Sequence, residues 1–325
     1  MAVYTHLSNE RIAQLVQETY GLGELLFAVG IAQGVENSNY LLTIRPPEGA
    51  EIRTILTLYE KRVKPEDLPF FLGLMQHLHG RGIACPQPIA TVSGALLTEV
   101  EGKHAAMVSF LHGRSRTVLR NAHMASLGGA VAALHAGVEG YGLRRQNTLS
   151  LIGWQQLYRS MEGQLNQLQE GLAAMVADEL TWLEAHWPQH LPRGIIHADL
   201  FPDNVFFEGD SVSGIIDFYF ACEDAFAYDL AIVMNAWCFE HQREFNLTKS
   251  GLLLAAYAKI RPLSAEEKAA LPILCRGAAL RFLLTRAYDA LYTQPGAMVQ
   301  VKDPLEYVQK LRFHQRVQSV VEYGL

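Results

Sequence analysis

The chain has 325 residues, of which 50% are hydrophobic and 18% are charged, and its formal net charge is −6. This composition supplies enough apolar material for a large core and excludes intrinsic disorder, which requires low hydrophobicity and a high net charge. It also argues against nucleic-acid binding through phosphate neutralisation, because the densest basic stretch, residues 60–64, is short. We therefore predict a globular protein without a nucleic-acid partner.

The cysteines and the N-terminal sequence point to a cellular compartment. The four cysteines are widely spaced and form no C-x-x-C pair, so we expect buried free thiols rather than a zinc site or a disulfide framework. Residues 1–11 contain no basic segment followed by an apolar run, and the longest strongly apolar stretch, 127–134, is far shorter than a membrane span. These features predict a soluble cytoplasmic protein with no signal peptide and no membrane partner.

The first third of the sequence alternates short apolar runs with turns. Residues 9–20 are predicted to form an amphipathic helix, because apolar residues recur at helical spacing and Ser8 can cap the N-terminus. A second helix is predicted over 68–80. Strands are predicted over 25–32, 35–44, 52–59, 89–92, 95–99 and 105–111. An antiparallel sheet with one main helix implies a small N-terminal lobe, residues 1–112.

The remainder of the chain, residues 113–325, has a mostly helical pattern. Helices are predicted over 118–137, 150–169, 176–187, 226–241, 247–260, 266–290 and 304–322. One strand-rich segment, 193–220, interrupts them. The sequence therefore predicts an α+β protein with two unequal lobes.

The strand-rich segment carries the chemistry. It contains H-x-D-x-x-x-x-N, with His197, Asp199 and Asn204, and a following apolar strand ends at Asp217. Phosphoryl transfer from ATP needs one carboxylate beside the acceptor hydroxyl, and it needs a second carboxylate with an amide oxygen to hold Mg²⁺ against the phosphates. A hairpin between Asn204 and Asp217 would bring both to one metal ion. The competing interpretation is a set of polar residues that cap turns. We expect His197 to pack and hydrogen-bond the loop backbone rather than to act as the base.

The N-terminal lobe offers a second candidate region, for the nucleotide. Residues 30–40 join two strands with small and polar side chains, where a backbone can cover phosphates, although no Walker A motif is present. An ordinary hairpin is the alternative. The apolar run 106–111 connects the lobes, and its main-chain groups can meet an adenine unless it is simply a buried strand. The candidate nucleotide-contacting residues are Gly34, Asn37, Ser38, Asn39, Ser109 and Leu111.

These motifs resemble a known family. The chain is similar to the protein-kinase-like phosphotransferases of the aminoglycoside/choline kinase group and, within it, to the bacterial type II homoserine kinases. The resemblance runs nearly end to end, through the segments GVENSNYLL (34–42), LTLYEKR (56–62), DLPFFLGLM (67–75), HADLF (197–201), IDFYFA (216–221), NAWCFE (235–240), RGAALRF (276–282) and KDPLEY (302–307). It implies a bilobal kinase-like fold and phosphorylation of L-homoserine by MgATP in threonine biosynthesis. Carried over by position, Asp199 is the catalytic carboxylate, and Asn204 and Asp217 are the Mg²⁺ ligands.

One departure from the wider kinase pattern concerns the phosphates. Many kinase-like enzymes have a Lys or Arg on the third strand, paired with a Glu on the following helix. Here Thr57 occupies the expected basic position and Phe71 lies near the expected Glu. Both halves of the ion pair are replaced together, which avoids a lone buried charge. Lys61 has the same strand parity as Thr57, so the phosphate charge is met by Lys61, by main-chain amides or mostly by Mg²⁺.

The acceptor site is less defined. A zwitterion such as homoserine requires a cation for its carboxylate, and Arg281 is our candidate, against the alternative of a structural salt bridge. Tyr219 is expected to line the pocket unless it packs in the core, and Asp229 is expected to brace the catalytic loop. Two other functions stay open: another small-alcohol or aminoglycoside kinase, and a catalytically silent nucleotide-binding scaffold.

Overall fold

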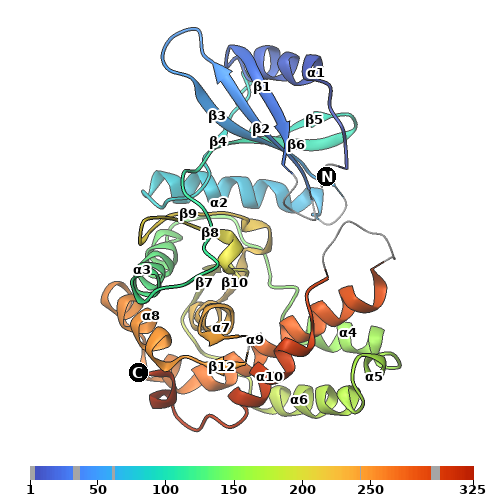
Figure 1. Cartoon of the computed structure of the whole chain (residues 1–325), viewed down its shortest axis with the longest axis vertical. Helices are drawn as coiled ribbons and strands as arrows, with labels where there is room; N and C mark the ends of the chain where they lie inside the picture. The colour runs from blue at the N-terminus through green and yellow to red at the C-terminus, as the bar shows by residue number, and fades with distance from the viewer. Residues whose placement is uncertain (1–3, 32–36, 61–62, 242, 294–300) are drawn as a thin grey trace. The chain divides into compact units, whose positions relative to one another are not determined.

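The structure is a computed structural model that describes residues 4–31, 37–60, 63–241, 243–293 and 301–325. It divides into two compact units, whose elements are labelled in Figure 1. The first unit comprises Met1–His112 and Gly214–Tyr219, and the second comprises Gly113–Ser213 and Phe220–Leu325. The first unit therefore includes a short segment, 214–219, that follows a long passage of the chain through the second.

An antiparallel sheet forms the centre of the first unit. Its strands are β1 (Glu24–Gly30), β2 (Ser38–Arg45), β3 (Ile52–Leu58), β4 (Pro88–Ile89), β5 (Thr98–Val100) and β6 (Lys103–Ser109). The spatial order is β1-β2-β3-β6-β4, and β5 pairs with β6. The helical elements are α1 (Asn9–Gln14), a π-helical turn (Leu15–Thr19), a 3-10 turn (Pro65–Asp67) and α2 (Leu68–Gly80). The predicted strand over 89–92 is shorter than expected, because a turn around Gly94 interrupts the pairing.

Strand alternation gives the sheet one apolar face. The register pairs Tyr40 with Leu56 and places Leu42 and Leu58 on the same face. This face packs against Ile12 of α1, against Leu15 and Val16 of the π-helical turn, and against Tyr20, which follows that turn. The opposite face carries a row in which Asn39 lies beside Thr57, and Thr57 beside Ala106.

Helices dominate the second unit. They are α3 (Asn121–Gly137), α4 (Leu151–Met161), α5 (Leu165–Leu168), α6 (Leu172–His186), α7 (Phe226–Trp237), α8 (Leu247–Ile260), α9 (Ala265–Tyr292) and α10 (Leu305–His314), with a final 3-10 turn at Val320–Tyr323. α3 packs on α8, and α9 packs on both α7 and α10. Gly128 permits the first of these contacts, because a Cβ there would run into the main-chain carbonyl of Leu253. No helix in the described ranges is long and apolar enough to cross a membrane.

Short strand pairs carry the motif segment. β7 (Arg193–Ile196) pairs with β10 (Cys222–Ala225), and β8 (Val205–Glu208) pairs with β9 (Ser211–Ile215) as the predicted hairpin. Two 3-10 turns flank the hairpin, at Pro202–Asn204 and Phe218–Phe220. A further small pair joins β11 (Phe239–Glu240) to β12 (Glu244–Phe245). The motif residues thus sit on the loops between paired strands, where side chains can reach a ligand.

Candidate active site

The loop that follows β7 has an unusual backbone. Ala198 has a φ of +63°, in the left-handed region that residues with a Cβ avoid, and it lies directly before Asp199. Asp217, at the end of the hairpin, has a φ of +64°. Such a conformation costs about 1–2 kcal/mol for a non-glycine residue and persists only where surrounding contacts hold it. Both predicted carboxylates are therefore placed by a strained main chain.

Asp229 holds the loop from α7. Its Oδ2 accepts the main-chain N–H of His197 at 2.9 Å, and its Oδ1 accepts that of Ala198 at 2.8 Å. The Nε2 of His135, on α3, lies 3.0 Å from the same carboxylate, and Tyr257 Oη lies 2.8 Å from Nδ1 of that imidazole. Although burial alone would raise it, these contacts with His135 and His197 hold the pKa of Asp229 below its usual value.

Asp199 is held on the other side by Asn204. The Nδ2 of Asn204 donates to the main-chain oxygen of Asp199 at 2.8 Å and to its Oδ2 at 3.1 Å. The N–H of Asp199 lies 3.3 Å from Nδ1 of His197, which is fully buried. His197 thus contacts the loop backbone, and the side chain of Asp199 has a fixed direction.

The donor chemistry of Asn204 fits a magnesium ligand. Both of its side-chain hydrogen bonds come from Nδ2, which leaves Oδ1 as the hard oxygen donor that Mg²⁺ prefers. No group of three or more His, Cys, Asp or Glu side chains among the described residues could hold a metal ion. A set of one amide oxygen and few carboxylates suits Mg²⁺, because that ion keeps waters and phosphate oxygens as its other ligands.

Tyr219 lies in an aromatic cluster of the first unit. Its ring meets those of Tyr59 and Phe71 edge to face, with centroid distances of 5.4 and 5.7 Å. The two tyrosine hydroxyls are 3.1 Å apart. Burial raises the pKa of Tyr219 to about 12, so its hydroxyl stays protonated. These contacts pack the ring against the aromatic cluster, and Tyr219 is half-buried.

The predicted nucleotide-contacting residues have internal partners. Gly34 and Lys61 lie outside the described residues. Ser38 is fully buried, where its hydroxyl accepts the N–H groups of Tyr4 and Thr5 and donates to Glu60. Asn37 Oδ1 accepts the N–H of Glu60, and Asn39 Oδ1 accepts the hydroxyl of Thr57. Ser109 Oγ accepts the N–H of Gln87. The side chain of Leu111 lies against Gly214.

Arg281 lies inside the second unit, at the middle of α9. It is 1% exposed, and its Nη1 donates to the main-chain oxygen of Ala198 at 2.6 Å. The guanidinium lies 4.7 Å from the ring centre of Phe282 and 5.8 Å from that of Phe220. The predicted cation is therefore next to the catalytic loop, in contact with its backbone.

Trp237, in the segment NAWCFE, also supports this loop, because its indole N–H donates to the main-chain oxygen of Leu200 at 2.7 Å. Sequence reasoning did not single out two further residues, His135 and Tyr257. His135 contacts the Asp229 carboxylate, and Tyr257 contacts the other nitrogen of that imidazole. No motif marks His135 or Tyr257. Each occurs within an apolar helical pattern. In such a pattern, the sequence does not distinguish a buried side chain that supports the loop from one that only packs in the core.

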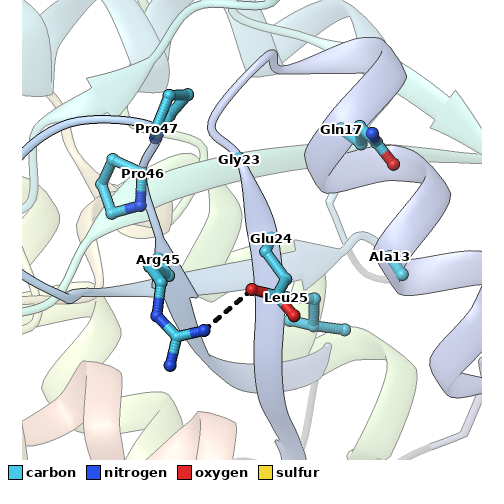
Figure 2. Close-up of a pocket in the computed structure, with 8 residues that line it drawn as sticks. All are labelled: Ala13, Gln17, Gly23, Glu24, Leu25, Arg45, Pro46 and Pro47. Atoms are coloured by element: carbon cyan, nitrogen blue, oxygen red, sulfur yellow. Dashed lines mark hydrogen bonds and ion pairs between the residues drawn. The ribbon is translucent and has the colours of Figure 1, made fainter.

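A surface pocket of the first unit contains none of these residues. Figure 2 shows it between α1, β1 and β2, where the carboxylate of Glu24 lies 2.9 Å from the guanidinium of Arg45. The residues that line it are Ala13, Gln17, Gly23, Glu24, Leu25, Arg45, Pro46 and Pro47. None was predicted to have a functional role, and the ion pair is exposed to solvent.

The chain is similar to known proteins in sequence and in structure. Residues 28–263 match the phosphotransferase enzyme family. A homoserine kinase of Rhizobium rhizogenes is 53% identical over 100% of this chain and 99% of its own length, and one of Paramagnetospirillum magneticum is 52% identical over 100% of both. Among solved structures, an amicoumacin kinase in complex with AMP-PNP, Ca²⁺ and its antibiotic has a TM-score of 0.69 at 16% identity, covering 97% of this chain and 93% of that one.

A microcompartment-associated aminopropanol kinase has a TM-score of 0.65 at 18% identity, covering 98% of this chain and 99% of that one. These structural likenesses confirm the predicted α+β kinase-like fold. The sequence likenesses extend through both units and confirm the resemblance on which the expected family rests. The chain therefore belongs to the phosphotransferase enzyme family, and the two full-length relatives named above are homoserine kinases.

Proposed function

We propose that this protein is an ATP-dependent homoserine kinase. It transfers the γ-phosphoryl group of ATP to the side-chain hydroxyl of L-homoserine, giving O-phospho-L-homoserine and ADP in threonine biosynthesis. The observation that carries the proposal is the identity of 52–53% to homoserine kinases over the whole chain. The matched length covers both units and the catalytic loop. The four buried free cysteines fit the reducing cytoplasm, where we place the enzyme.

Asp199 is the catalytic carboxylate in this proposal. It orients the acceptor hydroxyl and accepts its proton as the acceptor oxygen forms a bond to the γ-phosphorus and the bond to the bridging oxygen of ADP breaks. The contacts with Asn204 and His197 support this role, because they fix the direction of the carboxylate before the substrate arrives. Asp229 and His197 stabilise the loop without touching the reacting atoms.

Asn204 and Asp217 are proposed to hold Mg²⁺, Asn204 through Oδ1 and Asp217 through its carboxylate. When bound, Mg²⁺ neutralises the charge that develops on the β- and γ-phosphate oxygens. The nucleotide is proposed to lie against Gly34, Asn37, Ser38, Asn39, Lys61, Ser109 and Leu111. Because the side chains of Asn37, Ser38 and Ser109 bond within the first unit, the main-chain groups of this set are the proposed contacts.

The acceptor site is proposed to involve Tyr219 and Arg281. Tyr219, with a protonated hydroxyl, is proposed to border the homoserine site. Arg281 is the candidate for the substrate carboxylate, and its Nη1 also donates to the main-chain oxygen of Ala198. A kinase for another amino alcohol is the second candidate function, favoured by the fold shared with the aminopropanol kinase.

The test is release of ADP from MgATP with a panel of acceptors. We expect homoserine to give the highest turnover over background, and serine, choline and an aminoglycoside to give little. Turnover with another member of the panel and none with homoserine would contradict the proposal and favour the second candidate. ATP binding without turnover on any acceptor would instead indicate a nucleotide-binding scaffold.

A further inference from the structure

We propose that Arg281 is a positioning residue, which sets the direction of the Asp199 carboxylate by holding the peptide between Ala198 and Asp199. This inference rests on the proposed kinase activity and assigns a role within it. It differs from the substrate-binding role predicted for Arg281, because the group that the guanidinium contacts is a main-chain carbonyl of the enzyme.

Both polar groups of the peptide between Ala198 and Asp199 have a side-chain partner. Its carbonyl, from Ala198, accepts Nη1 of Arg281 at 2.6 Å. Its N–H, from Asp199, lies 3.3 Å from Nδ1 of His197. The carbonyl and N–H of a trans peptide point in opposite directions, so a donor on one side and an acceptor on the other fix its rotation. The side chain of Asp199 is attached to the Cα atom that follows this N–H. The rotation of the peptide therefore helps to set the direction of the carboxylate.

The charged side chains around the loop match the polarity of the main-chain groups that they contact. The anionic carboxylate of Asp229 accepts the N–H groups of His197 and Ala198, whereas the cationic Arg281 takes the carbonyl of Ala198. An ionised partner makes each hydrogen bond stronger than a neutral one. Ala198 requires such support, since its φ of +63° is a conformation that alanine otherwise avoids.

Burial keeps Arg281 in this position. The side chain is 1% exposed and packs against the rings of Phe282 and Phe220. It comes from the middle of α9, a helix of 28 residues that packs on α7, the source of Asp229. Asp229 and Arg281, which we call the clamp, therefore come from two helices in direct contact. Helix packing sets the distance between these two side chains.

The test compares Arg281→Met and Arg281→Lys by steady-state kinetics with homoserine and MgATP. Methionine keeps the apolar packing and removes the donor, so we expect kcat to fall about 100-fold while KM for both substrates changes less than about threefold. Lysine retains a cationic donor and should recover part of that loss. Arg276→Met is the matched control, because Arg276 lies on the same helix and bonds Glu179 at 2.7 Å through two nitrogens, away from the loop. It should lower Tm and leave kcat of the folded enzyme near the wild-type value.

A second comparison keeps the test decisive if Arg281→Met does not fold. Ala198→Gly lets residue 198 adopt a positive φ without a steric penalty. Arg281→Lys should therefore cost a smaller factor in kcat in the Ala198→Gly background than in the wild type. A rise in KM for homoserine with unchanged kcat would overturn the inference and restore the carboxylate-binding role. Equal losses in both backgrounds would also overturn it. An inactive wild-type enzyme would refute the proposed function rather than the clamp.

Discussion

At the scale of single residues, main-chain contacts define the candidate site. Asp199 is held by Asn204 at its own carbonyl and carboxylate, and by His197 at its N–H. A carboxylate that is fixed in advance does not need to be ordered when the acceptor binds, which is how positioning lowers the barrier to phosphoryl transfer. The contacts thus support the proposed role of Asp199, and they distinguish it from its neighbour Asp203, which forms an exposed ion pair.

The first prediction concerns this carboxylate. Asp199→Asn preserves size and removes the proton acceptor, so turnover should fall about 10²- to 10⁴-fold. ATP affinity, measured by calorimetry, should stay close to the wild-type value, because the substituted group faces the acceptor. Asp203→Asn is the matched control. Asp203 lies four residues further along the same loop and forms an exposed ion pair with Lys302, so its variant should keep near-normal turnover. Near-normal turnover in Asp199→Asn would remove it from the mechanism.

At the scale of elements, local sequence signals predicted most boundaries. The sequence predicts a helix over 266–290, and α9 extends over Ala265–Tyr292 because Ser264 and Glu267 form a capping box. The helix predicted over 150–169 is two helices, since α4 ends at Met161, a turn containing Gly163 follows, and α5 covers Leu165–Leu168. Glycine disfavours a helix interior, and the apolar spacing outweighed that signal in the prediction.

The contacts between elements that are distant in sequence could not be predicted from the sequence. Arg281 reaches a carbonyl 83 residues away, and His135 reaches a carboxylate 94 residues away. Apolar spacing shows which face of a helix is buried, but it does not show which distant backbone atom lies opposite a polar side chain on that face. The catalytic motif could be predicted because its residues are close in sequence. The clamp that holds it depends on helix packing and could not.

A second prediction concerns α10 and its contacts with α7 and the C-terminal turn. His314 is buried, with Nδ1 2.7 Å from the hydroxyl of Tyr323 and Nε2 3.2 Å from Oδ1 of Asn235. Burial, together with the positive charges of Lys310 and Arg276, lowers the pKa of His314 to about 3. The neutral imidazole is therefore the form that the folded protein contains.

The sign of the pH dependence follows from that difference. In the unfolded chain histidine takes up a proton near pH 6.5, whereas folded His314 does not until about pH 3. Its contribution to stability is fully present above pH 6.5 and is lost as the pH falls below that value. Between pH 7 and pH 5, the free energy of unfolding should fall by about 2 kcal/mol more in the wild type than in His314→Gln. Urea titrations at both pH values measure this, with exposed His190→Gln as the control. Equal falls in wild type and His314→Gln would contradict it.

At the scale of the whole molecule, charge sets a requirement for ligand binding. The chain has a net charge of −6, and ATP is itself highly anionic. Thr57 replaces the expected third-strand cation, and its hydroxyl is occupied by Asn39. Like charges repel, so the nucleotide depends on Mg²⁺ and on a few placed donors. This dependence should appear in the stability of the entire protein, because a ligand that binds only the folded state stabilises it.

The third prediction is that MgATP raises Tm and that ATP in excess EDTA raises it much less. At a ligand concentration of 100 times Kd, binding adds about 2.7 kcal/mol to the free energy of unfolding, and a weaker complex adds correspondingly less. Asp217→Asn should reduce the difference between the two conditions, because it removes a proposed Mg²⁺ ligand. Asp210→Asn is the control, since Asp210 lies on the hairpin turn and pairs with Arg120 at the surface. Thermal scans of the three proteins with ATP, in Mg²⁺ and in EDTA, measure the effect. An equal rise in Tm in Mg²⁺ and EDTA would show that protein donors alone hold the nucleotide.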